Sequence, residues 1–526
     1  MLRISNVKLP LSYTEDDLRR RAANLLGVPV LECRLFRRSV DARKKDNVHF
    51  IATLDVTVAD EAAALRRAKS GVTRVEEPPA VLPAPAAQPA LPPVVVGSGP
   101  AGLFAALTLA RAGVRPILLE RGDDVDSRRA AVDTFHRTGV LDTASNVQFG
   151  ESGAGTFSDG KLNSGIKDPR CRQVLETFVA AGAPQEILWQ AKPHIGTDKL
   201  QATVRGLRNR IIELGGQVLF RHQVTDMVVE NGILTALIVS TPEGEREIPC
   251  SHVILAIGHS ARDTAEMLHR RGLPMEQKPF AVGVRVEHPR GMIDKSQYGP
   301  AAGHPALGAA DYKLNCRPDT GRGVYTFCMC PGGTVVAAAS EEEMVAVNGM
   351  SVFARDAANS NSALLVGVEP ADFGSEHPLA GFEFQRKWER AAYTLGGGGY
   401  RAPAQLVGDF LADRASAGAG EVTPSYQPGV TWCDLRECLP SFVSASLKEA
   451  LPIFGRQLRG FDRADTVLTG IESRSSSPVR LLRDARGRSS VAGIYPCGEG
   501  AGYAGGIMSA AVDGIRCATW LMEDRV

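Results

Sequence analysis

Three glycines close to residue 100 stand at the spacing G-x-G-x-x-G, as Gly97, Gly99 and Gly102. In such a pattern the first glycine permits a tight turn, the second lets a pyrophosphate approach the main chain, and the third lets a helix pack closely on a strand. Glu120, further along the chain, can accept hydrogen bonds from an adenosine ribose. Together these residues predict a dinucleotide site.

The residues around the glycines predict the elements that position them. Residues 94–96 are three valines, typical of a short buried strand, and an apolar helix follows the glycines. Residues 117–119 predict a second buried strand that ends at Glu120. The N-terminus of the helix offers free N–H groups and a partial positive charge to phosphates. Because strand, turn, helix, second strand and acid occur in register, we favour a dinucleotide site over a purely structural turn.

The segment 94–122 resembles the FAD-binding fingerprint of the glutathione-reductase-like flavoproteins. Pro100 and Ala101 in the glycine turn, and Arg121 after the acid, are more similar to the FAD form of the motif than to the NAD form. These flavoproteins carry a second signature near the C-terminus, and residues 493–507 look like it. The resemblance implies an FAD-binding protein. Because the sequence shows no flavinylation motif, we expect FAD to be bound without a covalent bond, and because it shows no secretory signal or membrane span, we expect a cytoplasmic protein.

The resemblance also implies which residues hold FAD. Glu499 would lie by the ribityl and pyrophosphate groups, and a helix from about Met508 would point its N-terminus at the flavin, where its dipole stabilises the reduced ring. The glycine-rich segment 149–162 would lie against the cofactor, and Val224 would meet the adenine. Arg128 either contacts the pyrophosphate or lies on a solvated helix face. The expected FAD site comprises Gly97, Ser98, Gly99, Pro100, Ala101, Gly102, Glu120, Arg121, Arg128, Gly155, Thr156, Asp159, Gly160, Lys161, Val224, Ala256, Gly258, Gly498, Glu499, Gly505, Gly506 and Ile507.

We predict an α/β fold in which a Rossmann-like three-layer FAD-binding domain carries an inserted α+β substrate-capping domain and follows a small N-terminal α+β domain. The expected ranges are 1–77 for the N-terminal domain, 78–93 for a Pro/Ala linker, 94–275 and 466–526 for the FAD-binding domain, and 276–465 for the cap. In the FAD-binding domain we expect a helix at 199–214, a strand at 217–220, a hairpin at 224–239 turning at Asn231 and Gly232, and a buried strand at 252–258. In the N-terminal domain we expect a strand at 1–8, a helix opened by residues 12–16, strands within 48–58 and a helix at 60–69.

Composition excludes several classes of protein. The chain has 526 residues, enough for two or three domains, and its 60 basic side chains nearly balance 59 acidic ones, so no nucleic-acid surface is indicated. We see no secretory signal, and prolines interrupt the one long uncharged stretch, 78–110, so we expect no membrane span. The ten scattered cysteines form neither a secreted disulfide framework nor a standard zinc pattern, and we predict no metal.

The residues that would carry out the reaction are less clearly marked. Cys328 and Cys330 form C-x-C, which could relay electrons between reduced flavin and a disulfide substrate if a thiolate is activated nearby. The alternative is an alternating strand with both cysteines buried on one face. His259, directly after the buried strand 252–258, is a candidate proton donor; the alternative is a turn histidine that caps a helix.

The chain carries one complete nucleotide motif, and we find no second one between Gly122 and Val491. This favours an oxidoreductase, a dehydrogenase or oxidase, that transfers a hydride between a small organic substrate and flavin N5. One alternative is a flavin monooxygenase or reductase that uses NAD(P)H as a transient reductant. The other is a non-enzymatic FAD-stabilised scaffold or redox sensor whose N-terminal domain recruits a partner. Its sequence support is a set of basic residues, Arg37, Arg38, Arg43, Lys44 and Lys45, for which we favour a solvated basic loop as the explanation. Further segments resemble a broad group of bacterial FAD-dependent dehydrogenases: 39–45, 324–333, 347–351 and 472–478.

Overall fold

Short apolar strands from four distant parts of the chain form one parallel sheet. The computed structural model describes residues 1–68, 71–76 and 89–524, so most of the predicted linker lies outside the described residues. The strands run in the order β23-β11-β5-β6-β7, and every neighbouring pair is parallel. Their bounds are Val94–Val96 for β5, Ile117–Leu119 for β6, Gln217–Leu219 for β7, Val253–Leu255 for β11 and Ile494–Pro496 for β23.

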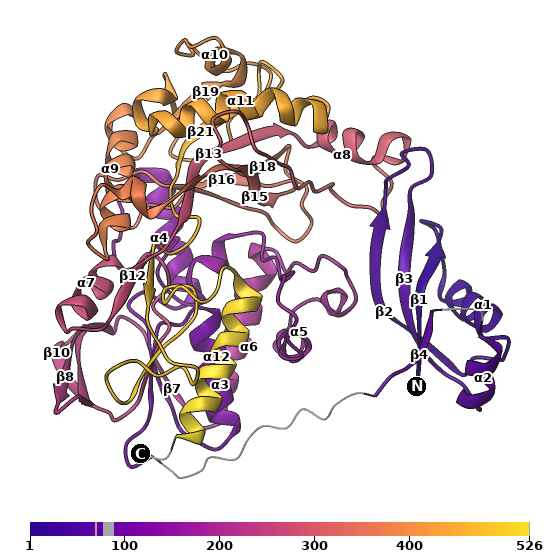
Figure 1. Cartoon of the computed structure of the whole chain (residues 1–526), viewed down its shortest axis with the longest axis horizontal. Helices are drawn as coiled ribbons and strands as arrows, with labels where there is room; N and C mark the ends of the chain where they lie inside the picture. The colour runs from indigo at the N-terminus through magenta and orange to yellow at the C-terminus, as the bar shows by residue number, and fades with distance from the viewer. Residues whose placement is uncertain (69–70, 77–88, 525–526) are drawn as a thin grey trace.

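The two faces of this sheet are covered by different layers (Figure 1). Val95 packs among helices on one face, whereas Val94 and Val96 pack against a second sheet on the other, as the alternation of a strand requires. The helices are α3 (Pro100–Arg111), α6 (Thr197–Glu213) and α12 (Ile507–Glu523), and the second sheet is the antiparallel β8 (Gln223–Glu230), β9 (Ile233–Thr241) and β10 (Gly244–Pro249). This three-layer arrangement, here called the parallel-sheet lobe, confirms the predicted fold class.

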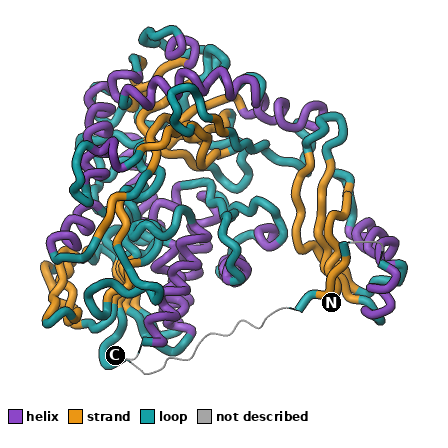
Figure 2. Tube along the Cα trace, in the orientation of Figure 1, coloured by secondary structure: helices purple, strands orange, loops and turns teal. Residues whose placement is uncertain are grey.

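A mixed seven-stranded sheet forms the second large part of the molecule, here called the cap lobe (Figure 2). Its order is β14-β15-β18-β13-β21-β19-β20, and the apolar core on one side of it includes α11 (Ser441–Gln457). The strands are β13 (Phe280–Pro289), β14 (Asn315–Cys316), β15 (Val324–Cys330), β18 (Asn359–Val368), β19 (Ala402–Leu406), β20 (Val430–Trp432) and β21 (Val467–Glu472). The chain enters this sheet after β11 and leaves it after β21, before it completes the parallel sheet with β23. The exact domain boundaries remain predictions.

The N-terminal module is a four-stranded sheet with two helices, set beside the rest of the chain (Figure 1). Its elements are β1 (Leu2–Leu9), α1 (Glu15–Leu26), β2 (Glu32–Asp41), β3 (His49–Thr57), α2 (Glu61–Arg67) and β4 (Val72–Arg74). The expected solvated basic loop is present only in part: Arg43, Lys44 and Lys45 are exposed residues between strands, whereas Arg37 and Arg38 lie on β2. The main-chain N–H of Arg38 donates to the carbonyl of Trp189 at 2.6 Å, and its guanidinium stacks 4.4 Å from the Trp189 ring. Arg38 therefore attaches the module to the body of the protein.

Several predicted elements are confirmed with small shifts of their ends. The hairpin of β8 and β9 turns at Asn231 and Gly232, both in the left-handed region, with φ of 51° and 79°. The helix expected at 199–214 is α6, and the helix expected from Met508 begins one residue earlier. The structure adds β2 and β10, which the sequence analysis missed. Within the described residues, no helix has both the length and the apolar composition that a membrane crossing needs.

Candidate functional site

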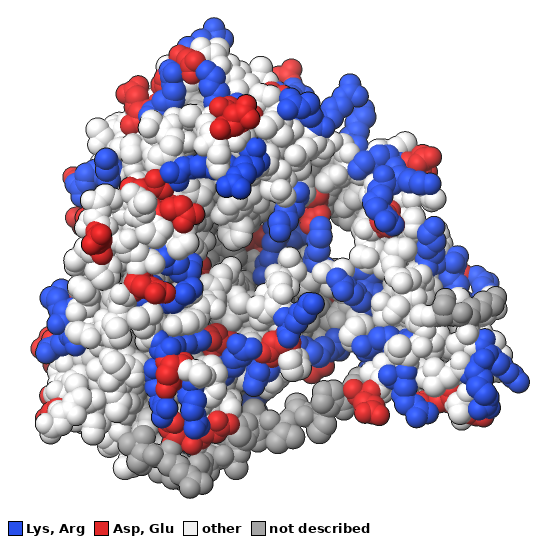
Figure 3. Space-filling view, in the orientation of Figure 1, with Lys and Arg blue, Asp and Glu red and all other residues white. Residues whose placement is uncertain are grey.

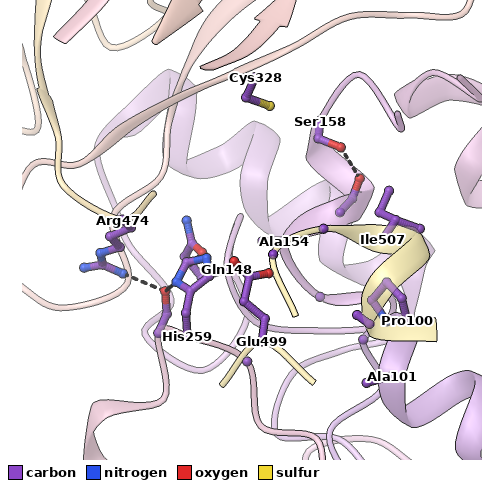
Figure 4. Close-up of a pocket in the computed structure, with 18 of the residues that line it drawn as sticks. Pro100, Ala101, Gln148, Ala154, Ser158, His259, Cys328, Arg474, Glu499 and Ile507 are labelled. Carbon is purple, nitrogen blue, oxygen red and sulfur yellow. Dashed lines mark hydrogen bonds between the residues drawn. The ribbon is translucent and has the colours of Figure 1, made fainter. Parts of the chain in front are cut away.

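A cavity of about 610 Å³ is lined by residues of both lobes (Figure 4). Val96, Leu119 and Ala256 place it at the carboxyl ends of β5, β6 and β11, where open parallel sheets bind ligands. Figure 4 shows Cys328 of the cap lobe opposite Pro100 and Ile507 of the parallel-sheet lobe. The volume lies in the range of about 300–1,000 Å³ that is usual for small-molecule and cofactor sites.

The glycine turn at the start of α3 is sterically specified at two of its three positions. A Cβ on Gly97 would lie 2.4 Å from the carbonyl oxygen of Ala256, and one on Gly102 would lie 1.8 Å from that of Gly97. Gly97 also has φ of +95°, which L side chains rarely adopt. A Cβ on Gly99, in contrast, would meet no described atom within 4 Å. Gly97 and Gly102 thus close the turn, whereas Gly99 leaves its main chain open to a ligand.

Two helices begin at this cavity without a side-chain cap. Gly99 is the N-cap residue of α3 and Gly506 that of α12, and neither N-terminus has a side-chain cap bond within the described part of the chain. Gly505 and Gly506 also face open space. Free N–H groups and helix dipoles therefore point into the cavity from two directions, an arrangement suited to two electron-rich groups of one ligand. FAD offers such a pair in its pyrophosphate and its reduced flavin, so the residues present fit FAD.

Glu120 lines the cavity, but its carboxylate already accepts four hydrogen bonds. Oε2 accepts from the Ser98 main-chain N–H at 2.9 Å and from the Ser98 hydroxyl at 2.6 Å. Oε1 accepts from the N–H groups of Gly122 and Gly150 at 2.9 and 3.0 Å. A carboxylate has about four lone-pair sites. A ribose could therefore bind Glu120 only where the rotatable Ser98 hydroxyl turns away.

Most of the residues predicted for the site line the cavity. They are Gly97, Gly99, Pro100, Ala101, Glu120, Arg121, Gly155, Asp159, Gly160, Lys161, Val224, Ala256, Gly258, Glu499, Gly505, Gly506 and Ile507, with Cys328 and His259 among the candidate catalytic residues. Six described residues of the prediction do not line it: Ser98, Gly102, Arg128, Thr156, Gly498 and Cys330. Three of them lie directly behind lining residues. The Ser98 hydroxyl donates to Glu120, Gly102 packs against the carbonyl of Gly97, and a Cβ on Gly498 would lie 2.8 Å from that of Ala101.

Arg128 corrects the prediction of a pyrophosphate contact and also its alternative of a solvated face. The side chain is fully buried, and its guanidinium donates to the carbonyls of Asn146, Glu151 and Val147 at 2.8, 2.6 and 3.0 Å. It also donates to the hydroxyl of Thr156 at 3.2 Å. Arg128 and Thr156 therefore hold the segment 146–156 in place and are turned away from the cavity.

Cys328 and Cys330 occupy different environments on β15. The strand has an irregularity between Phe327 and Cys330, and Cys328 has φ of +40°, so the predicted alternation with both cysteines on one face is wrong. Cys328 lines the cavity, whereas Cys330 is fully buried and its thiol approaches the Cys328 carbonyl oxygen at 3.4 Å. The side-chain interaction with Cys330, with the charges of Arg285 and Lys161, lowers the pKa of Cys328 to about 5, while the same pairing raises the pKa of Cys330. The cavity therefore presents a thiolate near pH 7.

A buried ion pair lies behind Cys328. Arg285 on β13 is fully buried and donates to the carbonyl of Cys328 at 2.9 Å, to the side-chain oxygen of Asn348 at 2.7 Å and to Glu472 at 3.1 Å. Glu472, the last residue of β21, lines the cavity, and burial raises its pKa to about 7 despite Arg285. The sequence analysis missed Arg285. Its signal is a single arginine inside the otherwise apolar run 280–286.

His259 belongs to a second charged network at the other side of the cavity. Its Nδ1 lies 3.0 Å from the hydroxyl of Ser260, which in turn accepts from Arg474 at 3.3 Å (Figure 4). Burial, followed by the charges of Arg474 and Arg262, lowers the pKa of His259 to about 4. The imidazole is therefore neutral near pH 7, which argues against the predicted role as an imidazolium proton donor. Glu389, also fully buried, bridges the two arginines.

One cluster with metal-binding side chains occurs among the described residues, and it lies outside the cavity lining. Cys497, Asp513 and Cys517 are buried together. Arg483 donates to both oxygens of Asp513 at 2.7 and 3.0 Å and approaches the sulfur of Cys517 at 3.4 Å. Because the guanidinium already supplies the positive charge, we assign no metal to this cluster.

Comparisons with known proteins agree with the cavity's chemistry in general terms. Residues 91–276 match an FAD binding domain, residues 279–475 match the C-terminal domain of FAD-dependent proteins, and residues 1–57 match a domain of unknown function. Among solved structures, a triple mutant of the flavin-dependent brominase Bmp2 is 11% identical, with a TM-score of 0.39 and coverage of 82% of this chain and 80% of that one. The FrdA chain of E. coli quinol fumarate reductase is 12% identical, with a TM-score of 0.38 and coverage of 83% and 70%. Structures that differ this much from the chain do not identify a reaction for it.

A much closer relative is an uncharacterized protein from Clostridium beijerinckii. It is 47% identical over 529 aligned residues, which cover 99% of this chain and 98% of the relative. The chain therefore belongs to one family with this Clostridium beijerinckii protein and carries that family's FAD-binding domain.

Proposed function

We propose that the protein is an FAD-dependent oxidoreductase that transfers a hydride between a small organic substrate and flavin N5. The observation that carries this proposal is one continuous cavity with two kinds of wall. At one end, the open glycine turn and two uncapped helix N-termini suit a dinucleotide. At the other end, ionisable side chains of the cap lobe face the same space, as a substrate site beside a cofactor requires.

In this proposal the parallel-sheet lobe holds FAD mainly through its main chain. The N-terminus of α3 at Gly99 would receive the pyrophosphate, and that of α12 at Gly506 would face the flavin. Val224 and Glu120 would lie at the adenosine end. When bound, FAD supplies the two-electron chemistry.

The cap lobe would then supply the groups that act on the substrate. Oxidation of an alcohol or amine by hydride removal also releases a proton, which needs an acceptor close to the substrate. Cys328 and Glu472 both line this part of the cavity. Their pKa values, about 5 and about 7, mean that each can be deprotonated near pH 7 and can then accept such a proton. The buried Arg285 fixes both of them, since it donates to the Cys328 carbonyl and to Glu472.

Anaerobic mixing of the purified protein with candidate reductants tests this function. We expect yellow protein whose absorbance near 450 nm is bleached by an organic donor and is unchanged by NADPH or NADH. Rapid bleaching by NADPH or NADH would instead support the monooxygenase or reductase alternative. A colourless protein that binds no added FAD would overturn the proposal.

A second candidate function is favoured by the cysteine pair. Cys328 faces the cavity as a thiolate beside the thiol of Cys330. Attack of Cys328 on a disulfide substrate, followed by attack of Cys330, would form a Cys328–Cys330 disulfide and release two substrate thiols. Reduced flavin, itself regenerated by NAD(P)H, would provide the two electrons that return the pair to its dithiol state. If Cys328→Ser and Cys330→Ser variants still reduce a disulfide substrate at the original rate, this candidate is excluded.

A further inference from the structure

We propose that the cap-side end of the cavity binds an anionic group of the substrate, a carboxylate or a phosphate, between the ammonium groups of Lys161 and Lys313. The inference rests on the proposed function, because it names the class of substrate that this site would take: an organic acid or a phosphate ester. It comes from the balance of charges that line this end of the cavity.

Six cationic side chains line the cavity. Arg121 and Arg474 are paired with Asp263 and Glu389, and two of the other four are also neutralised within the protein. Nζ of Lys192 lies 2.9 and 2.7 Å from the two carboxylate oxygens of Asp311. Nε of Arg355 donates to Oδ1 of Asp159 at 2.9 Å, and a second guanidinium nitrogen donates to Oδ2. The carboxylates of Asp159 and Asp311 are therefore already paired with cations of the protein.

The other two cations, Lys161 and Lys313, keep most of their charge available. Nζ of Lys161 is 3.9 Å from Oδ2 of Asp159, beyond hydrogen-bond distance and on an oxygen that Arg355 already uses. Lys313 is exposed and makes no hydrogen bond or ion pair with any residue that the structure describes. The ammonium groups of Lys161 and Lys313 are therefore the cavity-lining cations that remain available to a negatively charged group of a ligand.

Neutral groups that could donate or accept hydrogen bonds accompany these lysines. Asn163 and Ser164, two and three positions after Lys161, line the same cavity. An anion held by two ammonium groups and such neighbours would be fixed in orientation as well as in position. Its uncharged carbon skeleton could then extend along Cys328 toward the space between the two lobes.

Positive charge also gathers on the surface beside the N-terminal module. Figure 3 shows Lys and Arg side chains gathered around the hollow between the N-terminal module and the rest of the protein. Contacts connect this module to the cavity wall, because Lys45 donates to the carbonyl of Gln297, whose side chain donates to the carbonyl of Asp311 at 2.8 Å. A concave surface of one charge sign raises the local concentration of ligands with the opposite charge.

The test is the binding of simple anions to the FAD-loaded protein at constant ionic strength. Succinate and inorganic phosphate serve as probes, uncharged succinamide is the control ligand, and both the flavin spectrum and the melting temperature are recorded. We expect at least one anion to bind saturably and to stabilise the protein, and succinamide to do neither. Tighter binding of phosphate would assign phosphate esters, and tighter binding of succinate would assign organic acids.

Variants locate the effect. Lys161→Met and Lys313→Met should each weaken the anion about tenfold, or about 1.4 kcal/mol, whereas Lys161→Arg should retain most of the binding. Lys199→Met is the matched control, since Lys199 is an exposed lysine of α6 outside the cavity lining, and it should change nothing. Failure of the original, unsubstituted protein to bind FAD would overturn the proposed function itself. Normal FAD binding with no anion effect, or with equal affinity in the Lys161→Met, Lys313→Met double variant, would overturn the anion site alone.

Discussion

The two lobes that share the cavity form their walls by different means. In the parallel-sheet lobe the wall is mostly main chain: glycine turns and the first residues of α3 and α12. In the cap lobe the wall is made of side chains from separate strands, with Cys328 on β15 and Glu472 on β21, both held by Arg285 on β13. A wall that binds a ligand through the main chain requires a continuous local sequence motif. A wall built from converging side chains requires only that the fold bring distant residues together. The first therefore leaves a sequence pattern that can be recognised, and the second does not.

Substitution of the glycine turn should have the largest effect. A Cβ on Gly102 would lie 1.8 Å from the main-chain oxygen of Gly97, an atom that cannot move without opening the turn. We expect Gly102→Ala to lower the free energy of unfolding of the apoprotein by about 4 kcal/mol and to abolish FAD binding. Urea unfolding and FAD titration measure both effects.

Gly99→Ala is the matched control, because a Cβ there would meet no described atom within 4 Å and φ is −63°. Its apoprotein should be as stable as the original within about 0.5 kcal/mol, although FAD binding should weaken. If both alanine variants had equal stability, the two glycines would not differ in the way that their geometry indicates.

The cap lobe should be most sensitive at its buried charges. Glu389 is fully buried and bonded to Arg262 and Arg474, with distances of 2.8 Å in each pair. Glu389→Gln leaves two buried arginines with less compensating charge, so we expect a loss of about 3 kcal/mol in the free energy of unfolding. Glu383→Gln, on the same helix, α9 (Ala380–Leu395), removes a carboxylate that is 68% exposed, and it should cost less than about 0.5 kcal/mol. Equal losses would show that the Glu389 network is not a stabilising unit.

Sequence patterns predicted the parallel-sheet lobe well for a physical reason. Gly97, Gly99 and Gly102 act on neighbours only a few residues away, so their spacing specifies the turn and its ligand chemistry. Arg128 shows the limit of this reasoning: it follows the motif closely, yet tertiary contacts to the segment 146–156 bury it completely. Whether a charged helix residue faces a ligand, solvent or the interior depends on the distant segment that packs on it.

The cap lobe could be predicted much less well. Arg285, Cys328 and Glu472 are separated by long stretches of chain and meet only because β13 lies between β18 and β21 in the sheet. The left-handed φ of Cys328 was equally hidden, because the alternating residues around it indicate a regular strand. The motif 472–478 could be noticed in the sequence, but its two cavity-lining charges, Glu472 and Arg474, could not be assigned partners.

The titration of Glu499 should have a smaller effect on stability. Burial raises the pKa of Glu499 in the folded protein to about 7, above an ordinary value of about 4.5. A raised carboxyl pKa means that the folded state holds its proton longer than the unfolded state, so stability falls as pH rises from about 5 to about 7. Over that pH range, the free energy of unfolding of the Glu499→Gln apoprotein should fall by about 2 kcal/mol less than that of the original apoprotein. Parallel pH dependences in the two proteins would contradict the assignment.

The smallest expected effect concerns the charge that Lys161 contributes to Cys328. The pKa of Cys328, lowered to about 5 by Cys330, Arg285 and Lys161, predicts that iodoacetamide labels this thiol at a rate that is nearly constant between pH 7 and pH 9. An ordinary thiol reacts increasingly fast over the same range, because its thiolate fraction still rises toward a pKa of about 8.5. Peptide mass spectrometry of the apoprotein separates Cys328 from the buried Cys330.

Lys161→Met should raise the pKa of Cys328 only slightly, since Lys161 is the smaller of the two cationic contributions and Arg285 remains. Cys330→Ser should have the larger effect, because the side-chain interaction with Cys330 is the principal cause of the shift. If labelling of Cys328 rises steeply from pH 7 to pH 9 in the original protein, its thiol is not activated and the cysteine relay loses its support. If it is flat and both variants shift it in this order, then the reactivity of Cys328 is set by its strand neighbour Cys330 together with Lys161, a residue far away in the chain, and this long-range dependence distinguishes the cap lobe from the glycine turn.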